Sequence, residues 1–285
     1  MINRFWQTSR FRIDLQHPRV MGIVNLTPDS FSDGGRDGSA LESLRRCEQL
    51  IAQGADLLDL GAESTRPGAQ PLGADEELAR LLPVLKDAIS LGVPISVDTY
   101  KPQVMRAALD LGADLINDIW ALRWQPPGAA SALDVLATHP QCGVCLMHMH
   151  LEPQTMQLAP MQGSVVAPVL HFLQSRAEAA QVAGIARERL AIDPGIGFGK
   201  TVEQNFEILA DQSALLAAGL PLVVGWSRKS SLAGMSAEPQ ALAANERLVP
   251  SVVTAVLAVQ RGASVLRVHD VRETVQALKT LERAR

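Results

Sequence analysis

Short apolar segments alternate along the chain with longer stretches of helical periodicity. At several junctions a Gly, or Gly followed by Ala, ends a helical stretch and leads directly into an apolar segment, as in QGADLLDLG, LGVPISVDT, LGADLINDI, AGLPLVVGW and RGASVLRVHD. Gly at such a junction can end a helix in the left-handed conformation. A nearly continuous apolar segment is typical of a parallel strand that is buried on both faces. The pattern therefore predicts a repeated helix–strand unit.

Eight segments fit this description of a strand: residues 20–25, 56–61, 94–99, 114–119, 143–148, 190–194, 221–226 and 264–269. An open doubly wound sheet and a closed (β/α)8 barrel both fit this alternation, so the positions of the polar residues must distinguish them. An open sheet would concentrate polar residues at the single point where the strand order reverses. Here nearly every strand carries one at or just after its C-terminal end.

These strand-end residues come from the first and last strands alike: Asn25, Glu63, Asp98, Asn117, His148, Asp193, Lys229, Arg267 and His269. In a closed ring the first and last strands are neighbours, and all C-terminal ends meet at one mouth, where barrel enzymes carry their active sites. We therefore predict an α/β fold with one domain, a (β/α)8 TIM barrel over residues 19–285. Residues 1–18 form an N-terminal extension that we expect to cover the closed end or the flank of the barrel.

Composition and charge narrow the functional class. Hydrophobic residues make up 47% and charged residues 20% of the chain, which is ordinary for a globular protein. The net charge is −4 and no block of like charges occurs, so we expect no nucleic-acid partner. The N-terminal residues lack the apolar stretch of a signal peptide, and no apolar run is long enough to span a membrane. We expect a cytoplasmic protein that makes no membrane contact.

The cysteines offer little chemistry. Cys142 and Cys145 form a lone CxxC in an apolar segment, with no second pair nearby to complete a zinc site. We interpret both as buried core thiols.

Two loops at the predicted mouth are rich in Gly, Pro, Ser and Thr: residues 27–38 after the first strand and residues 63–73 after the second. Such composition disfavours helix and strand, and long loops at the mouth of a barrel often contact the substrate. We expect mobile covers of the site; the alternative is that they are merely solvated connections.

Two short motifs resemble ligand sites without meeting their requirements. DPGIGFGKT ends like a phosphate-binding loop, but Pro194 stands where that motif requires Gly. His148 and His150 are spaced like a metal-binding pair, but only His269 remains at the mouth to complete such a site. We expect instead that Asp193 points into the mouth, that the glycines after it let a flat ligand approach the backbone, and that Phe198 lines this pocket.

The predicted mouth combines cationic groups with carboxylates. The cationic or hydrogen-donating residues are Arg66, Arg228, Lys229, Arg267 and His269. Arg267 and His269 share a face of their strand and can reach one anion, which predicts an anionic substrate. Opposite them we place Asp98, Asn117 and Asp193. Carboxylates and an amide suit the N–H-rich edge of a flat heterocycle such as a pterin or guanine. The alternative is that the two carboxylates form only scaffold salt bridges.

The strand-end motifs, in order, resemble the dihydropteroate synthase family over residues 19–285: MGIVNLTPDSFSDGG, DLGAESTRPGA, SVDTYKP, INDI, LMHM, DPGIGFGKT, GWSRKS and RVHD. The resemblance implies the condensation of 6-hydroxymethyl-7,8-dihydropterin diphosphate with 4-aminobenzoate. The products would be 7,8-dihydropteroate and diphosphate, in folate synthesis. The resemblance also implies a homodimer and a Mg²⁺ ion.

The same resemblance implies three groups of site residues. The pterin would be held by Asp98, Asn117, Asp193, Lys229 and Arg267. The diphosphate would be held by Asn25, Thr65, Arg66, Arg267 and His269, with Asn25 as the metal ligand. The aminobenzoate would be held by Phe31, Asp33, Pro67, Lys229 and Ser230. In one departure, His150 and Leu151 stand where the family more often has Gln and Gly, which leaves the conformation of the loop after the fifth strand open.

The expected chemistry requires no covalent enzyme intermediate, because no Ser or Cys in these motifs stands beside an obvious base. Asn25, Arg267 and His269 would stabilise the departing diphosphate, and the electron-rich dihydropterin would delocalise the resulting methylene cation. We therefore expect a dissociative, SN1-like substitution. Two alternatives are a pterin-binding methyltransferase barrel, which has no need of the STRPG, SRKS and RVH elements, and a catalytically silent pterin-binding paralogue.

Overall fold

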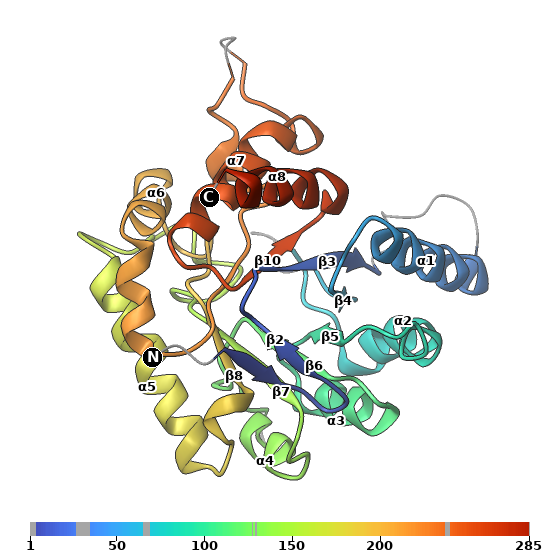
Figure 1. Ribbon diagram of the computed structural model, residues 1–285. Helices are drawn as coiled ribbons and strands as arrows, with labels where there is room; N and C mark the ends of the chain where they lie inside the picture. Colours follow the sequence, from blue (N-terminus) through green and yellow to red (C-terminus); the bar gives the residue numbers. More distant parts are fainter. Residues whose placement is uncertain are drawn as a thin grey trace.

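The protein is a closed barrel of parallel strands surrounded by helices (Figure 1). The computed structural model describes residues 4–26, 35–64, 69–126, 128, 130–236 and 240–284. Eight strands are hydrogen-bonded in the order β8-β7-β6-β5-β4-β3-β10-β9, and the parallel bridge between Ile192 and Leu222 joins the two ends. The (β/α)8 barrel is thus confirmed, and an open doubly wound sheet is excluded.

The barrel strands lie where the apolar segments predict them. They are β3 (Arg19–Asn25), β4 (Leu57–Gly61), β5 (Ile95–Asp98), β6 (Leu115–Asp118), β7 (Gly143–Met147), β8 (Leu190–Asp193), β9 (Val223–Val224) and β10 (Val265–Val268). The first of these, β3, pairs in parallel with the last, β10, as a closed ring requires. The strand β9 is shorter than the predicted segment 221–226. Pro221, at the start of the predicted segment, has no N–H to donate to a ladder.

Helices connect the strands and cover the outside of the barrel (Figure 1). They are α1 (Gly35–Ala52), α2 (Ala74–Ala88), α3 (Pro102–Leu111), α4 (Ala132–Ala137), α5 (Val166–Val182), α6 (Val202–Ala210), α7 (Leu248–Gln260) and α8 (Val271–Arg283). Short 3₁₀ segments are η2 (Arg187–Arg189), η3 (Gln212–Ala218), η4 (Ser230–Leu232) and η5 (Ala244–Glu246). Within the described ranges, none of the helices has the length and apolar character needed to cross a bilayer.

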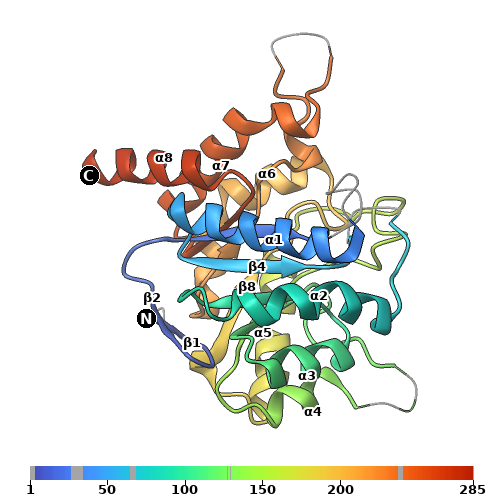
Figure 2. The same cartoon turned by 90° about the vertical axis from the view of Figure 1, so that its right-hand side faces the viewer.

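The residues before the barrel form an antiparallel hairpin of β1 (Phe5–Gln7) and β2 (Arg12–Asp14). Trp6 is fully buried in a cluster with strand residues that include Met21, Leu57 and Leu115. Its indole Nε1 donates to the carbonyl of Arg189 at 2.8 Å. Figure 2 shows the hairpin at the end of the barrel opposite to the direction in which β4 points. The N-terminal end of the barrel is therefore filled by an aromatic side chain, which leaves the C-terminal end for the predicted site.

The two cysteines of the CxxC motif are core residues, as predicted. Cys142 and Cys145 are both buried free thiols, and burial raises the pKa of each. A thiol with a raised pKa is a poor nucleophile at neutral pH.

Candidate active site

Arg267 of β10 is the centre of a charged cluster inside the C-terminal half of the barrel. Its Nε donates to Oδ2 of Asp59, and its Nη2 donates to Oδ2 of Asp98, both at 2.6 Å. Nδ2 of Asn117 donates to the same Asp59 oxygen at 3.2 Å. Residues from β4, β5, β6 and β10 meet here because alternate side chains of every barrel strand point inward. The structure thus brings together three of the predicted pterin-binding residues.

The charges of this cluster are interdependent. Burial of the Arg267 guanidinium disfavours its charge, but the carboxylates of Asp59 and Asp98 outweigh burial and raise its pKa above the ordinary value. Burial raises the pKa of Asp98 to about 7; Arg267 opposes this rise and Asp59 adds to it. One cation is therefore shared by two carboxylates, and a ligand with N–H donors would relieve the excess of negative charge.

Asp59 belongs to this cluster but was not predicted from the sequence, because it does not stand at the C-terminal end of its strand. It is fully buried in the middle of β4, and its Oδ1 has no hydrogen-bond partner among the described residues. A buried acceptor without a partner is uncommon in a folded protein and is often connected with function. The signal in the sequence is the carboxylate itself, which interrupts the apolar segment LLDLG.

Asp193 ends β8, and its carboxylate is close enough to Arg267 for the two charges to act on each other. Its Oδ1 accepts a hydrogen bond from the backbone N–H of Gly195 at 2.7 Å. Burial raises its pKa, which the backbone hydrogen bond from Gly195 and the charges of Lys229, Arg267 and Lys200 oppose. The alternative that both predicted carboxylates form only scaffold salt bridges therefore fits Asp98, which pairs with Arg267. It does not fit Asp193, whose Oδ1 is bound by a backbone N–H.

The glycines after Asp193 have a different role from the predicted one. All three adopt positive φ, and a Cβ on Gly195 would lie 1.9 Å from the carbonyl oxygen of His148. A Cβ on Gly199 would lie 2.6 Å from Cβ of His150. The expectation that these glycines admit a flat ligand is therefore wrong at these two positions, where the chain after β7 occupies the space.

Phe198 projects from this loop beside Lys229. The Lys229 ammonium lies 4.3 Å from the centre of the half-buried Phe198 ring. A cation at this distance from a ring face is attracted to it. The predicted lysine and the predicted aromatic side chain are thus neighbours.

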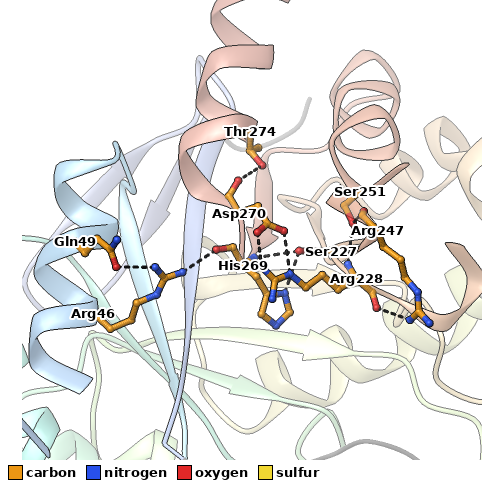
Figure 3. A network of polar contacts seen from close by, with 9 residues as sticks. All are labelled: Arg46, Gln49, Ser227, Arg228, Arg247, Ser251, His269, Asp270 and Thr274. Carbon is orange, nitrogen blue, oxygen red and sulfur yellow. Dashed lines mark hydrogen bonds and ion pairs between the residues drawn. The ribbon is translucent and has the colours of Figure 1, made fainter. Parts of the chain in front are cut away.

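His269 is held by its neighbours on both sides (Figure 3). Its backbone N–H donates to Oγ of Ser227 at 3.1 Å, and its Nδ1 lies 3.0 Å from the same oxygen. The carbonyl of His269 accepts a hydrogen bond from Arg46 of α1 at 3.1 Å. These contacts fix the backbone and ring of a predicted diphosphate ligand.

Arg228 has a partner of its own, contrary to the expectation that it adds a cation to the mouth. It forms two hydrogen bonds with the carboxylate of Asp270, from Nε at 3.1 Å and Nη2 at 2.5 Å (Figure 3). Its φ of 59° is unusual for a non-glycine residue, and its carbonyl accepts a hydrogen bond from Arg247. The positive charge of Arg228 is therefore paired with the carboxylate of Asp270.

The remaining predicted residues fall into two groups. Asn25 is half-buried at the end of β3, and Ser230 is exposed at the start of η4. Glu63 lies after β4 but pairs with the buried Lys101 and accepts a hydrogen bond from Tyr100. Outside the described residues lie Phe31, Asp33, Thr65, Arg66 and Pro67.

Asn25, the predicted metal ligand, suits one kind of metal site. In the part of the chain that the structure describes, no three His, Cys, Asp or Glu side chains converge as a ligand set. Mg²⁺ commonly takes one or two protein oxygens and completes its shell with water and substrate phosphates. A single amide oxygen at the mouth fits an ion that arrives largely on a phosphorylated substrate, and it does not fit a metal held by the protein alone.

Comparison with known proteins agrees with this geometry. Residues 21–269 match the family model for pterin binding enzymes. The dihydropteroate synthase of Neisseria meningitidis serogroup C is 45% identical over 99% of this chain and 98% of its own length. The structure of Burkholderia cenocepacia dihydropteroate synthase complexed with 7,8-dihydropteroate is 45% identical, has a TM-score of 0.87, and is matched over 100% of this chain and 97% of that chain.

A second solved structure gives the same result. Xanthomonas albilineans dihydropteroate synthase with 4-aminobenzoic acid is 46% identical, with a TM-score of 0.87 over 96% of this chain and 95% of that chain. The barrel, the Arg267 cluster and the 45% identity to a relative over 99% of the chain point to one conclusion. The chain belongs to the dihydropteroate synthase family, whose members are transferases.

Proposed function

We propose that this chain condenses (7,8-dihydropterin-6-yl)methyl diphosphate with 4-aminobenzoate to give 7,8-dihydropteroate and diphosphate, in folate synthesis. The observation that carries the proposal is the Arg267 cluster, which places a guanidinium between two carboxylates inside the barrel. The complexes of the Burkholderia and Xanthomonas relatives with dihydropteroate and 4-aminobenzoic acid support the same pair of substrates.

The pterin ring would lie among the inward-facing polar residues. Asp98 and Asp193 offer carboxylate acceptors to the N–H groups of the ring, and Asn117 offers an amide that both donates and accepts. Lys229, held beside Phe198, and Arg267 would contact the ring from the cationic side. A buried site that matches each N–H with an acceptor rejects rings that lack those groups, because its own polar atoms would be left unpaired.

The leaving diphosphate would be bound by Arg267, His269 and Asn25. Arg267 is kept charged by Asp59 and Asp98, and His269 is oriented by Ser227. Asn25 would hold Mg²⁺ together with the phosphate oxygens, and the bound ion would neutralise charge on the leaving group. Donors that are already oriented toward developing charge stabilise a transition state without reorganisation.

Substitution would proceed through loss of diphosphate before the new C–N bond is complete. The dihydropterin can delocalise the positive charge on its methylene carbon, and ionised Asp193 favours that charge. The amine of 4-aminobenzoate then attacks, so no protein nucleophile is required. Thr65 and Arg66 complete the proposed diphosphate site, and Phe31, Asp33, Pro67, Lys229 and Ser230 complete the aminobenzoate site.

The proposal is tested by substitution at the pterin end of the site. Asp193→Asn and Lys229→Ala should each lower kcat/KM by about a hundredfold or more, as removal of one preorganised polar group does in other enzymes. Exposed Lys86 of α2 supplies a matched control, and Lys86→Ala should leave kcat/KM unchanged. Turnover of either site variant within a few-fold of wild type would contradict the assignment.

The methyltransferase and silent-paralogue alternatives predict different products. A methyltransferase that transfers a methyl group to a corrinoid would release no diphosphate from the pterin substrate. A silent paralogue would bind the pterin without turnover. Coupled measurement of diphosphate and dihydropteroate distinguishes all three.

Two further parts of the proposal concern the state of the protein. Val249 and Val253 lie one turn apart on α7 and are 70% and 50% exposed, which favours burial of this helix face in a homodimer. Sedimentation should give the mass of a dimer for the wild type and of a monomer for Val253→Asp.

The three free cysteines suit a reducing compartment, which supports the cytoplasm as the location of the protein.

A further inference from the structure

Lys200 and His148 form a buried pair beside the pterin end of the site, and the reaction described above gives neither a role. Lys200 is 2% exposed and His148 is 5% exposed. Nζ of Lys200 lies 2.9 Å from Nδ1 of His148, 2.9 Å from the carbonyl oxygen of Gly195 and 3.2 Å from that of Phe198. An ammonium has three N–H donors, and each finds one acceptor here.

The imidazole in this pair is an acceptor. Burial is the largest cause that lowers the pKa of His148 to about 2. The charge of Lys200 comes next, and His150 and Arg123 lower the pKa further. A neutral imidazole whose Nδ1 accepts from an ammonium carries its proton on Nε2. His148 is further confined by the ring of Phe172, 4.9 Å away edge to face, and its backbone N–H donates to the backbone carbonyl of Asp193 at 2.9 Å.

Lys200 has no carboxylate in ion-pair contact within the described part of the chain. Burial lowers its pKa to about 7; the charge of Asp193 opposes this and that of Lys229 adds to it. The ammonium is therefore kept in place by neutral acceptors, and the negative charge of Asp193, a predicted pterin ligand, acts on it without an ion-pair contact.

The two carbonyls that Lys200 binds belong to residues that shape the site. The N–H of Gly195 donates to Oδ1 of Asp193 at 2.7 Å, so the position of Gly195 fixes that carboxylate. The ring of Phe198 lies beside the ammonium of Lys229. Lys200 thus connects His148, just after β7, with the loop after β8. Through Gly195 and Phe198 it is linked to two proposed pterin ligands, Asp193 and Lys229.

Within the described part of the chain, three cations act electrostatically on the Asp193 carboxylate: Lys200 from its own loop, Lys229 from the loop after β9 and Arg267 from β10. The carboxylate in turn acts on the buried thiol of Cys145 from β7. Burial favours the neutral acid, whereas each nearby cation favours the carboxylate. Removal of one of the three cations should therefore make Asp193 harder to ionise.

We propose that Lys200 is a positioning residue: with neutral His148 as acceptor, its ammonium fixes the loop of residues 195–199 and keeps Asp193 ionised for the pterin ring. This inference rests on the proposed function, in which Asp193 binds the pterin. It assigns a role to the GKT and MHMH motifs, which fit neither a phosphate-binding loop nor a metal pair.

Lys200→Met tests the inference, because it keeps the length of the side chain and removes its donors and charge. The KM for the dihydropterin diphosphate should rise about tenfold, the usual effect of losing a charge-assisted hydrogen bond. The acidic limb of the pH profile of kcat/KM should move to higher pH by about one pH unit, as expected for loss of a cation near a buried carboxylate. Lys86→Met is the matched control and should show neither change.

A purely structural lysine would lower the yield or thermal stability of folded protein without moving the acidic limb. A folded Lys200→Met variant with wild-type KM and a wild-type acidic limb would therefore overturn the inference. Calorimetric binding of a pterin that lacks the diphosphate gives a readout independent of turnover. Its affinity should fall about tenfold in Lys200→Met.

A second pair of variants decides the question even where Lys200→Met does not fold. His148→Asn keeps an acceptor oxygen near the position of Nδ1, and His148→Leu removes it. The Asn variant should keep KM within about threefold of wild type, while the Leu variant should raise KM and shift the acidic limb upward. Equal behaviour of the two would overturn the inference. If the wild type itself formed no dihydropteroate, the proposed function would fail instead, so the two failures are distinct.

Discussion

Asp59 and Arg267 lie 208 positions apart in the sequence, yet Nε of Arg267 donates to Oδ2 of Asp59 at 2.6 Å inside the barrel. Asp59 is fully buried, and the same oxygen also accepts from Asn117. The carboxylate of β4 therefore keeps the guanidinium of β10 both charged and fixed in direction. This is the property that a residue acting on a departing diphosphate requires.

Asp59→Asn should destabilise the protein because it leaves the half-buried Arg267 with a single carboxylate. The free energy of unfolding should fall by about 3 kcal/mol, the range found when one partner of a buried ion pair is removed. Urea titration measures the change. Asp87→Asn on the exposed side of α2 is the control and should stay within about 0.5 kcal/mol of wild type. An equally small effect at Asp59 would mean that the pair contributes little.

The pKa of Asp98 gives a stability prediction with a definite sign. Its folded pKa is about 7, well above the value of about 3.9 in an unfolded chain. Between these two pH values the folded state retains a proton that the unfolded state has lost, so the free energy of unfolding decreases as pH rises through this window. Above about pH 7 this contribution is constant.

Urea unfolding of wild type and Asp98→Asn from pH 4.5 to 8 isolates that contribution. Other buried carboxylates, such as Asp118 and Asp193, titrate in both proteins. The wild type should therefore lose stability relative to the variant as pH rises toward 7, and the two curves should run parallel above it. Parallel curves over the whole range would show that Asp98 is ionised throughout.

Ser227 should matter for binding of the leaving group although it was not among the predicted ligands. Ser227→Ala removes the acceptor of the His269 N–H and the partner of its Nδ1. Affinity for inorganic diphosphate, measured by calorimetry, should fall about five- to tenfold, equivalent to about 1 kcal/mol for the lost hydrogen bonding. Ser213→Ala, at an exposed position of η3, should bind as wild type does. Unchanged affinity in Ser227→Ala would mean that His269 does not depend on this contact.

Leu151 occupies a position where the backbone favours glycine. Its φ is 60°, and its side chain is 44% exposed. The left-handed conformation destabilises the folded state by about 1–2 kcal/mol when the residue has a Cβ. A glycine avoids this strain, but its more flexible unfolded state offsets part of the gain in the free energy of unfolding. Leu151→Gly should therefore raise the free energy of unfolding by about 0.5–1 kcal/mol.

Leu158 is the matched control for that substitution. It is 84% exposed and is not among the non-glycine residues with positive φ. Leu158→Gly should lower stability by about 0.5–1 kcal/mol through the entropy of the unfolded chain. Loss of stability in both variants would mean that the positive φ at Leu151 carries no strain.

The barrel could be predicted because its signals are local. Each strand is an apolar segment next to a helix end, and the polar residues beyond those segments mark the mouth. The segment 56–61 corresponds closely to β4, Leu57–Gly61. The hairpin of β1 and β2 could not be found in this way, because its strands have three residues each and show no alternation long enough to recognise.

The site was less accessible to sequence reasoning where a residue's role depends on a distant segment. Asp98 and Asp193 could be predicted because each stands at the C-terminal end of an apolar segment. Asp59 could not, because it lies within its strand. Nothing local indicates that Arg228 is matched by Asp270, or that the space over Gly195 and Gly199 is filled by the chain after β7. These contacts are set by tertiary packing.

The central claim is tested most directly by one assay of the wild-type protein. The protein is mixed with the dihydropterin diphosphate, 4-aminobenzoate and Mg²⁺, and diphosphate and dihydropteroate are followed together. We predict equal amounts of both products, and loss of both when Mg²⁺ is removed. Tight binding of the dihydropterin diphosphate without release of either product would contradict the proposed function and identify a silent pterin-binding paralogue.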